Sequence, residues 1–290
     1  MGDKMLTVFT PTFNRAAKLK RIYESLLFQS DEDFEWLIVD DGSTDDTCRI
    51  VKEFSANKFP IRYYKKENGG KHTAYNLALE KANGKYFFCV DSDDWLSENA
   101  IKIILQTFSK QNVNALIAYK KDQNGKLLSG TFPTDLERAG ILELARFYQC
   151  TGEFSLIFRT DYAREYPFPV FKGERFITEA VVYDRMFASE KAYLLPEIIT
   201  ICEYQNDGLT NNFNDIMKKN PTGYCLYFMQ RIDLEYSLRK KISAIGKYHC
   251  FCRMSKEKKI RYKGKYKMLV YLLMPLGWIA YCYYKKIRGF

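Results

Sequence analysis

Three aspartates in the segment Asp91-Ser92-Asp93-Asp94 have the types and spacing expected of a cation site. Carboxylates are hard oxygen ligands that suit Mg2+ or Mn2+, above all where a diphosphate supplies further oxygens. The segment follows an apolar run at residues 86–90, and in an extended chain the side chains of Asp91 and Asp93 leave on the same face. We therefore predict that this segment holds a divalent metal. The alternative is a loop whose aspartates only cap the following helix.

Polar residues also follow two other apolar runs. Asp40-Asp41-Gly42-Ser43 comes after residues 34–39, and Thr10-Pro11-Thr12 comes after residues 5–9. A carboxylate at Asp41 is able to accept a hydrogen bond from a base N–H or a ribose hydroxyl. A strand-ending turn explains the same residues equally well.

The turn Asn68-Gly69-Gly70-Lys71 also has two interpretations. Glycines let the backbone approach an anionic ligand closely, and Lys71 would supply a positive charge. An ordinary turn with a solvated lysine fits the spacing as well. The two histidines, His72 and His249, are not at metal-ligand spacing, and a single histidine is more often structural than catalytic.

Strands and helices alternate in the N-terminal part of the chain, and these elements must position the polar segments. We expect strands at residues 5–9, 34–39, 61–64 and 86–90, with helices between and after them, including residues 15–29, 71–82 and 97–109. This alternation predicts an α/β fold whose mostly parallel sheet is covered on both faces. Ligands of such sheets bind outside the carboxyl ends of the strands, where the polar segments fall.

The later part of the chain is less regular, with a hairpin turn predicted at Asn124-Gly125. We expect one catalytic domain over residues 1–212, followed by a helical, basic appendage over residues 213–290. Within the catalytic domain, residues 1–110 would form a nucleotide-binding half and residues 111–212 an acceptor-binding half.

Composition and cysteine usage narrow the class of protein. Of the 290 residues, 47% are hydrophobic, which supports a sizeable core and excludes global disorder. We expect no secretory signal, because the apolar stretch at residues 5–9 is too short for one. The eight cysteines are scattered, and their only close pair, Cys250 and Cys252, lacks the spacing of a zinc site. We interpret them as buried or idle thiols in a reducing compartment.

The positive charge is concentrated in the tail. Residues 215–290 hold 18 Lys plus Arg against 4 Asp plus Glu, in a chain of net charge +10. Residues 268–284 carry no charge, but Pro275 and Gly277 interrupt them and they are short for a membrane span. We expect this segment to lie in the plane of an anionic membrane surface. The alternative is a helix that packs on the catalytic domain.

Four segments together resemble the successive signatures of family 2 glycosyltransferases. In chain order they are VFTPTFNR at residues 8–15, LIVDDGS at residues 37–43, NGGKHTAYN at residues 68–76 and VDSDD at residues 90–94. The resemblance is strong over residues 5–99, and four motifs in the right order are far more specific than any one of them. It implies the GT-A fold, with its nucleotide-binding α/β domain, and an inverting transferase.

The resemblance also implies roles for single residues. The segment from Thr10 to Thr12 would line the nucleotide site, Asp41 would contact the base, and Asp93 would bind Mn2+ or Mg2+. The implied donor-binding set is Thr10, Pro11, Thr12, Asp41, Lys71, Asp91 and Ser92.

Inversion needs a base that takes the proton of the attacking acceptor hydroxyl. The family places this base near the start of a helix, often in a Glu-Asp pair with an arginine seven residues after the Glu. Here Thr178-Glu179 stands in that place with Arg185, so Glu179 would be the base and Asp184 the second candidate. The alternative for Glu179 is a carboxylate favoured by the helix dipole. Residues 204–210 resemble a loop that closes over donor and acceptor.

We therefore expect a metal-dependent enzyme that moves a sugar, as a hexosyl- or N-acetylhexosaminyltransferase, from a UDP-sugar to a saccharide. The acceptor would be lipid-linked, for example through polyprenyl diphosphate, in surface polysaccharide synthesis at the inner face of the plasma membrane. Nucleic acid is not an expected partner. The alternatives are a nucleic-acid-binding protein that uses the basic tail, a nucleotidyltransferase, or an inactive relative of the transferases.

Overall fold

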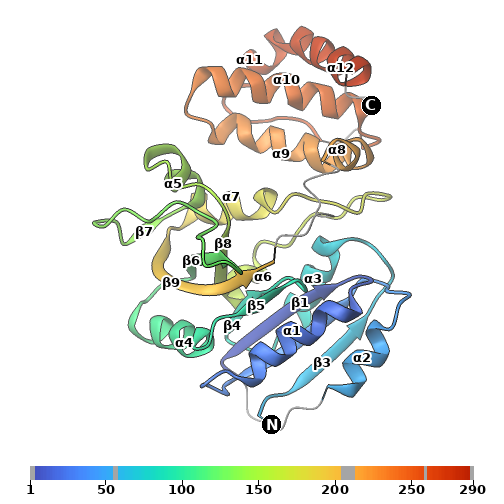
Figure 1. Ribbon diagram of the computed structural model, residues 1–290. Coiled ribbons are helices and arrows are strands. Elements are labelled where there is room, and N and C mark those ends of the chain that lie inside the picture. The colour runs from blue at the N-terminus through green and yellow to red at the C-terminus, as the bar shows by residue number, and fades with distance from the viewer. Residues whose placement is uncertain (1–3, 55–57, 204–212, 258–259, 288–290) are drawn as a thin grey trace. The chain divides into compact units, whose positions relative to one another are not determined.

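The chain folds into two units, each with its own hydrophobic core (Figure 1). The computed structural model describes residues 4–54, 58–203, 213–257 and 260–287. The first unit contains Met1–Pro167 and Val182–Tyr204, and the second contains Phe168–Val181 and Gln205–Phe290. The second unit, called the helical unit below, thus includes Phe168–Val181, which the sequence analysis assigns to the acceptor-binding half.

The first unit is built on one sheet, which has nine strands within the described residues. The strands are β1 (Leu6–Thr12), β2 (Phe34–Asp40), β3 (Ile61–Lys65), β4 (Tyr86–Cys89), β5 (Asp94–Leu96), β6 (Ala115–Asp122), β7 (Arg138–Ala139), β8 (Phe154–Arg159) and β9 (Ala192–Cys202). Four neighbours in the order β3-β2-β1-β4 are parallel. Beyond β4 the sheet is mixed, because β8 pairs antiparallel with both β4 and β6 while β9 runs parallel to β6. The predicted α/β fold is confirmed, with its parallel strands concentrated in the N-terminal half.

The carboxyl ends of the parallel strands meet at one edge of the sheet. Every residue of β1 and β2 is buried, as expected for strands covered on both faces. At the ends of these strands Thr12 pairs with Asp40, and the N–H of Asp41 donates to the carbonyl of Thr12 at 2.9 Å. On the other side of β1, the N–H of Val90 donates to the carbonyl of Phe9 at 2.8 Å. The segments after β1, β2 and β4 therefore reach the same edge.

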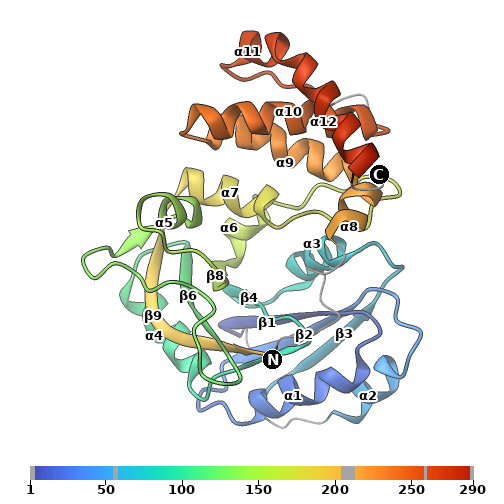
Figure 2. The same ribbon diagram turned by 45° about the horizontal axis from the view of Figure 1, so that its top comes forward.

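Helices cover both faces of these strands (Figure 2). The helices that lie wholly or mostly in the first unit are α1 (Ala16–Leu27), α2 (Thr47–Glu53), α3 (Lys71–Lys81), α4 (Ala100–Lys110), α5 (Ile141–Phe147), α6 (Thr160–Arg164) and α7 (Ala180–Ser189). On one face, apolar residues of α1 and α4 pack with Trp36 and Phe88. On the other face, Tyr75 of α3 contacts Phe9 and Phe87 edge-on. Phe87 and Phe88 face opposite sides because side chains alternate along a strand.

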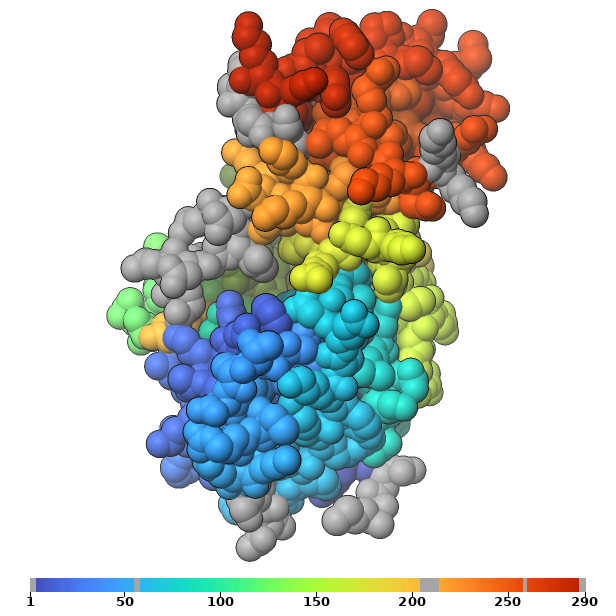
Figure 3. Space-filling model, turned by 90° about the vertical axis from the view of Figure 1, so that its right-hand side faces the viewer, coloured from blue at the N-terminus to red at the C-terminus, as the bar shows by residue number. Residues whose placement is uncertain are grey.

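Helices make up most of the second unit (orange to red in Figure 3). They are α8 (Phe213–Lys219), α9 (Pro221–Leu234), α10 (Leu238–Met254), α11 (Lys267–Leu272) and α12 (Met274–Ile287). A disulfide joins Cys225 of α9 to Cys252 of α10, so the interpretation of every cysteine as an idle thiol is wrong for this pair. Among the residues that the structure describes, none of the helices is both long enough and apolar enough to cross a membrane.

The segment Phe168–Val181 joins the helical unit at the start of α9. Glu174 accepts hydrogen bonds from the N–H groups of Thr222 and Gly223, at 2.6 and 2.8 Å. The first turn of a helix leaves such donors unpaired, and a carboxylate at this end also complements the helix dipole. The helical unit therefore depends on a segment from well before its own helices.

Candidate active site

The acidic segment forms the short loop between β4 and β5. The N–H of Asp94 donates to the carbonyl of Asp91 at 3.0 Å, which closes a tight turn at the edge of the sheet. Ser92 is buried in this turn, whereas the side chain of Asp91 is 37% exposed and that of Asp93 is 20% exposed. Two carboxylates are therefore accessible where ligands of such sheets bind.

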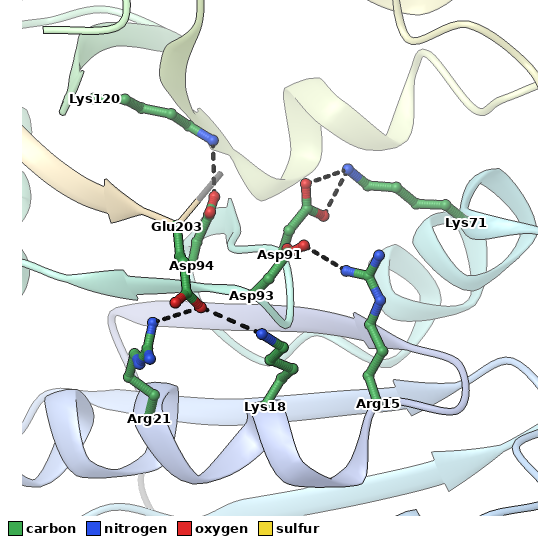
Figure 4. Close-up of polar contacts among 9 residues, drawn as sticks. All are labelled: Arg15, Lys18, Arg21, Lys71, Asp91, Asp93, Asp94, Lys120 and Glu203. Carbon is green, nitrogen blue, oxygen red and sulfur yellow. Dashed lines mark hydrogen bonds and ion pairs between the residues drawn. The ribbon is translucent and has the colours of Figure 1, made fainter. Parts of the chain in front are cut away.

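Each of these carboxylates has a cation partner from a separate element (Figure 4). Lys71 of α3 lies 2.7 Å from Asp91, and Arg15, just before α1, lies 2.6 Å from Asp93. Burial would raise the pKa of Asp91, but the charges of Lys71, Lys120 and Arg15 hold it below its usual range. Asp91 therefore keeps its negative charge at neutral pH.

The third aspartate, Asp94, points toward β6 (Figure 4). Its carboxylate lies 3.1 Å from the largely buried ammonium group of Lys120. Burial raises the pKa of Asp94, against the opposing effect of Lys120. The thiol of Cys202 in β9 lies beside this pair, and burial raises its pKa as well. Asp94 thus fixes the acidic loop to the second half of the sheet, and its role is structural.

Asp41 holds the glycine turn that precedes α3. Its carboxylate accepts hydrogen bonds from the N–H groups of Gly69 and Gly70, at 2.9 and 2.6 Å, and pairs with Lys66 at 2.7 Å. Gly70 has a φ of 94°, in the left-handed region that favours glycine. Because Lys71 follows directly, Asp41 indirectly positions the cation that meets Asp91. The segments at residues 40–43 and 68–71, each of which the sequence also allowed as an ordinary turn, therefore belong to one polar network.

A second set of hydrogen bonds fixes the backbone on both sides of Arg15. The N–H of Asn14 donates to Ser43 Oγ at 2.8 Å, and the N–H of Ala16 donates to Asp45 Oδ2 at 3.1 Å. Asn14 has a φ of 52°, which asparagine tolerates better than most residues. The segment after β2 therefore fixes the backbone of the segment after β1. The side chain of Arg15 is directed at the acidic loop.

The predicted nucleotide-binding residues at the end of β1 are all buried. The hydroxyl of Thr10 accepts a hydrogen bond from Trp36 Nε1 at 3.0 Å. Thr12 Oγ1 and both ring nitrogens of His72 are buried without a hydrogen-bond partner among the described residues. Burial lowers the pKa of His72 to about 4, so its ring is neutral at physiological pH. Because buried polar groups are normally paired, these atoms mark a place for further hydrogen bonds.

Glu203 joins the end of β9 to α1 and was not anticipated from the sequence. Its carboxylate lies 3.2 Å from Lys18 and 2.9 Å from Arg21 (Figure 4). The guanidinium of Arg21 also lies 4.7 Å from the ring centroid of Trp95 in β5. A single glutamate after an apolar strand carries no motif, so only the fold reveals this contact.

The predicted base lies at the start of α7. Glu179 precedes this helix and belongs to the second unit, whereas Asp184 is buried within α7 in the first unit. The guanidinium of Arg185 lies 5.9 Å from the ring centroid of Tyr166. Residues 204–210 lie outside the described residues. The assignment of Glu179 as the base remains a prediction.

The carboxylates of the acidic loop suit a metal ion whose remaining ligands are water and phosphate oxygens. Within the described residues, no group of three or more His, Cys, Asp and Glu side chains is placed to hold a metal. Asp91 and Asp93 offer hard carboxylate oxygens that are accessible on one edge. Two carboxylates leave most positions around Mg2+ or Mn2+ for water and phosphate oxygens, which is the usual arrangement for a metal bound with a nucleotide.

Comparison with known proteins agrees with this geometry. The sequence model described as Glycosyl transferase family 2 matches residues 7–161. A chondroitin synthase from Escherichia coli is 34% identical over 132 residues, which are 44% of this chain and 19% of that protein. The chain thus spans about a fifth of the length of this relative.

Two solved structures share the fold over nearly the whole chain. S. aureus TarS 1-349 in complex with UDP-GlcNAc has a TM-score of 0.64 at 18% identity, covering 97% of this chain and 90% of that one. The mannosyltransferase PcManGT from Pyrobaculum calidifontis, in complex with GDP-Man and Mn2+, has a TM-score of 0.54 at 16% identity, covering 97% and 74%. At these identities the likeness shows the fold alone, which is the GT-A fold.

Proposed function

Because this chain belongs to glycosyl transferase family 2, we propose that it moves a sugar from a UDP-sugar to a saccharide acceptor with inversion at the anomeric carbon. The observation that carries this proposal is the position of Asp41, Asp91 and Asp93 directly after β2 and β4, at the carboxyl edge of the parallel strands. Structures that share this fold hold UDP-GlcNAc in one case and GDP-Man with Mn2+ in another, which supports a nucleotide-sugar donor.

The residues at the edge divide into groups that bind the nucleoside and groups that bind the diphosphate. Asp41 and the unpaired hydroxyl of Thr12 would hold the base and ribose, together with Asp91 and Ser92. Asp93 would hold Mn2+ or Mg2+. When bound, the metal neutralises the negative charge that develops on the departing diphosphate. Lys71 adds a positive charge near the same phosphates.

Inversion follows from attack on the face opposite the leaving group. The acceptor oxygen forms a bond to the anomeric carbon while the bond from that carbon to the phosphate oxygen breaks. The nucleoside diphosphate leaves with the electron pair, and Glu179 takes the proton of the acceptor hydroxyl. Asp184 is the second candidate for this base.

The function is tested by mixing the full chain with a panel of UDP-, GDP- and ADP-sugars and Mn2+, with and without saccharide acceptors. We expect release of UDP from one UDP-hexose or UDP-N-acetylhexosamine, stimulated by an acceptor. Release of diphosphate from a nucleoside triphosphate would instead indicate a nucleotidyltransferase. Failure of every nucleotide sugar to bind would contradict the proposal.

We also propose that the helical unit attaches the enzyme to an anionic membrane surface, where a lipid-linked acceptor would be found. Apolar residues at intervals of three or four positions along α11 and α12 are exposed rather than buried. Met268 is 77% exposed and Leu272 is 72% exposed. The other exposed members of this apolar face are Tyr271, Met274, Trp278, Ile279 and Tyr283. The opposite face, which includes Val270 and Tyr284, is buried in the core of the second unit.

The charges around the apolar face favour an anionic membrane as its partner. Exposed lysines stand before α11, at its first residue and near the end of α12, namely Lys263, Lys265, Lys267, Lys285 and Lys286. An apolar and aromatic face with lysines at its two ends suits a bilayer that contains anionic lipids, because the rings enter the interface while the ammonium groups meet the head groups. A nucleic acid would bind the lysines but leave the apolar face exposed.

Liposome flotation tests the membrane proposal. We expect the full chain to bind phosphatidylcholine vesicles that contain roughly one third phosphatidylglycerol, and to bind pure phosphatidylcholine weakly. The double substitution Leu272→Ser and Ile279→Ser should lower binding by about tenfold or more, because each removes apolar area from the interface. The control is Phe28→Ser, which removes a residue that is 78% exposed in the first unit.

Two outcomes would contradict the membrane proposal. One is equal binding of the double variant and the parent chain to the anionic vesicles. The other is a dimer of the parent chain that the double variant converts to a monomer, which would make the face a subunit interface. A nucleic-acid shift at matched salt that exceeds vesicle binding would favour the nucleic-acid alternative.

A further inference from the structure

The negative charges of Asp91 and Asp93 in the acidic loop are each neutralised by a cationic side chain of the same chain. Arg15 Nη1 lies 2.6 Å from Asp93 Oδ2, and Lys71 Nζ lies 2.7 Å from Asp91 Oδ1. Lys120 pairs with Asp94, and its charge also acts on Asp91. The two carboxylates proposed to meet the metal and the donor therefore carry no net charge together with their partners. A divalent cation that arrives alone meets an already neutralised site.

The contact between Arg15 and Asp93 is held in place but remains reversible. The backbone around Arg15 is fixed by Ser43 and Asp45, so the guanidinium stays near the acidic loop. The side chain of Arg15 is 41% exposed, so it is able to swing without disturbing the core. An ion pair at this degree of exposure contributes little free energy, so a stronger partner is able to replace it.

A metal and a guanidinium compete for the same carboxylate, because both are positive and the charge that one neutralises attracts the other less. A diphosphate changes this balance, because its oxygens give the displaced guanidinium a better partner. Arginine matches phosphate geometry with two parallel N–H donors. A guanidinium displaced from Asp93 is therefore stabilised by the diphosphate and does not have to remain in water.

We propose that Arg15 is an exchangeable counter-ion that makes metal binding depend on the donor. Without the donor, Arg15 occupies Asp93 and weakens the binding of free metal. When the nucleotide enters with its metal, Asp93 passes from the guanidinium to the cation, and Arg15 passes to a phosphate oxygen. Lys71 makes the parallel exchange between Asp91 and the diphosphate. This inference rests on the proposed function, since it concerns the same donor site.

Binding measurements without turnover test the exchange. Free Mn2+ is followed by its electron paramagnetic resonance signal as the full chain is added, first without nucleotide and then with UDP. We expect Arg15→Gln to bind Mn2+ roughly fivefold more tightly than the parent chain without nucleotide, because a competitor has been removed. With Mn2+ present, the same variant should bind UDP on the order of tenfold more weakly, because a charged hydrogen bond to phosphate has been lost.

Two further variants make the result specific. Arg15→Lys keeps the positive charge, so its affinity for free Mn2+ should stay close to that of the parent chain. Lys18→Gln removes a cation one turn along α1 that pairs with Glu203 instead, so it should change neither affinity by more than about twofold. These outcomes together would support the exchange of partners at Asp93.

The inference and the proposed function fail in different ways. If the parent chain binds both UDP and Mn2+ but Arg15→Gln binds them with unchanged affinity, Arg15 is not a counter-ion and the inference is wrong. If Lys18→Gln strengthens Mn2+ binding as much as Arg15→Gln does, the effect comes from the loss of any positive charge and not from the pairing of Arg15 with Asp93, and the inference is again wrong. If the parent chain binds no UDP under any condition, the proposed function itself fails.

Discussion

Replacing Asp93 with asparagine should lower the turnover number for sugar transfer by about a thousandfold. Asparagine has nearly the same size, so the turn between β4 and β5 should persist, but the neutral amide binds a divalent cation far more weakly than a carboxylate does. The charge that develops on the departing diphosphate then loses its main stabilisation. Turnover is measured as UDP release at saturating donor and acceptor.

The same variant should lose the effect of metal on donor binding. In the parent chain we expect Mn2+ to strengthen UDP binding, and in Asp93→Asn this strengthening should disappear. A matched control is Asp161→Asn, whose carboxylate is 95% exposed and pairs with its neighbour Arg164 across one helical turn. Unchanged turnover in Asp93→Asn, with normal folding, would remove Asp93 from the metal site.

Glu179→Gln is expected to have the second largest effect. The substitution keeps the shape of the side chain but removes the carboxylate that we propose accepts the proton from the acceptor hydroxyl. Turnover should fall on the order of a thousandfold, in the usual range for loss of a general base. Affinity for UDP should stay within about twofold, because a general base would act on the acceptor hydroxyl rather than on the nucleotide. Turnover and the UDP dissociation constant are measured on the same preparation.

Two comparisons decide whether Glu179 is the base. Glu165→Gln changes an exposed glutamate at the end of α6 and should retain full activity. Asp184→Asn tests the second candidate, which is buried in α7. If Glu179→Gln stays active while Asp184→Asn loses turnover, the base belongs to α7 and the assignment of Glu179 is wrong.

The edge of the sheet was predictable because local patterns define it. The apolar runs of β1, β2 and β4 end where polar residues begin, so parallel strands alone bring Thr12, Asp41 and Asp91 to one rim. The turn at Asn124-Gly125 was predictable for the same reason, and the N–H of Gly125 donates to the carbonyl of Asp122 there. Each of these features depends on few residues close together in the chain.

The partners of the acidic loop could not be predicted because they come from other elements. Lys120 lies within β6, and nothing in its neighbourhood distinguishes a buried lysine from an exposed one until Asp94 is placed beside it. Arg15 belongs to a conspicuous motif, yet its contact with Asp93 depends on how the fold places the loop between β4 and β5 near the start of α1. Side-chain pairing across a sheet is a property of the assembled fold rather than of sequence spacing.

The organisation of the second unit shows the same limit. The disulfide between Cys225 and Cys252 spans 27 residues and depends on how α9 packs against α10. The attachment of Glu174 to the start of α9 joins segments that the sequence would place in separate domains. Helices themselves follow from periodicity, but their partners follow from packing, which no short pattern records.

Calorimetric titration of UDP into the full chain tests the central claim most directly, namely that the carboxylates at the edge of the sheet bind a cation that holds a diphosphate. The titration is made once with excess Mn2+ and once with a chelator. The account predicts a dissociation constant that is about tenfold or more lower with Mn2+. The same affinity in both titrations, or no binding in either, would contradict it.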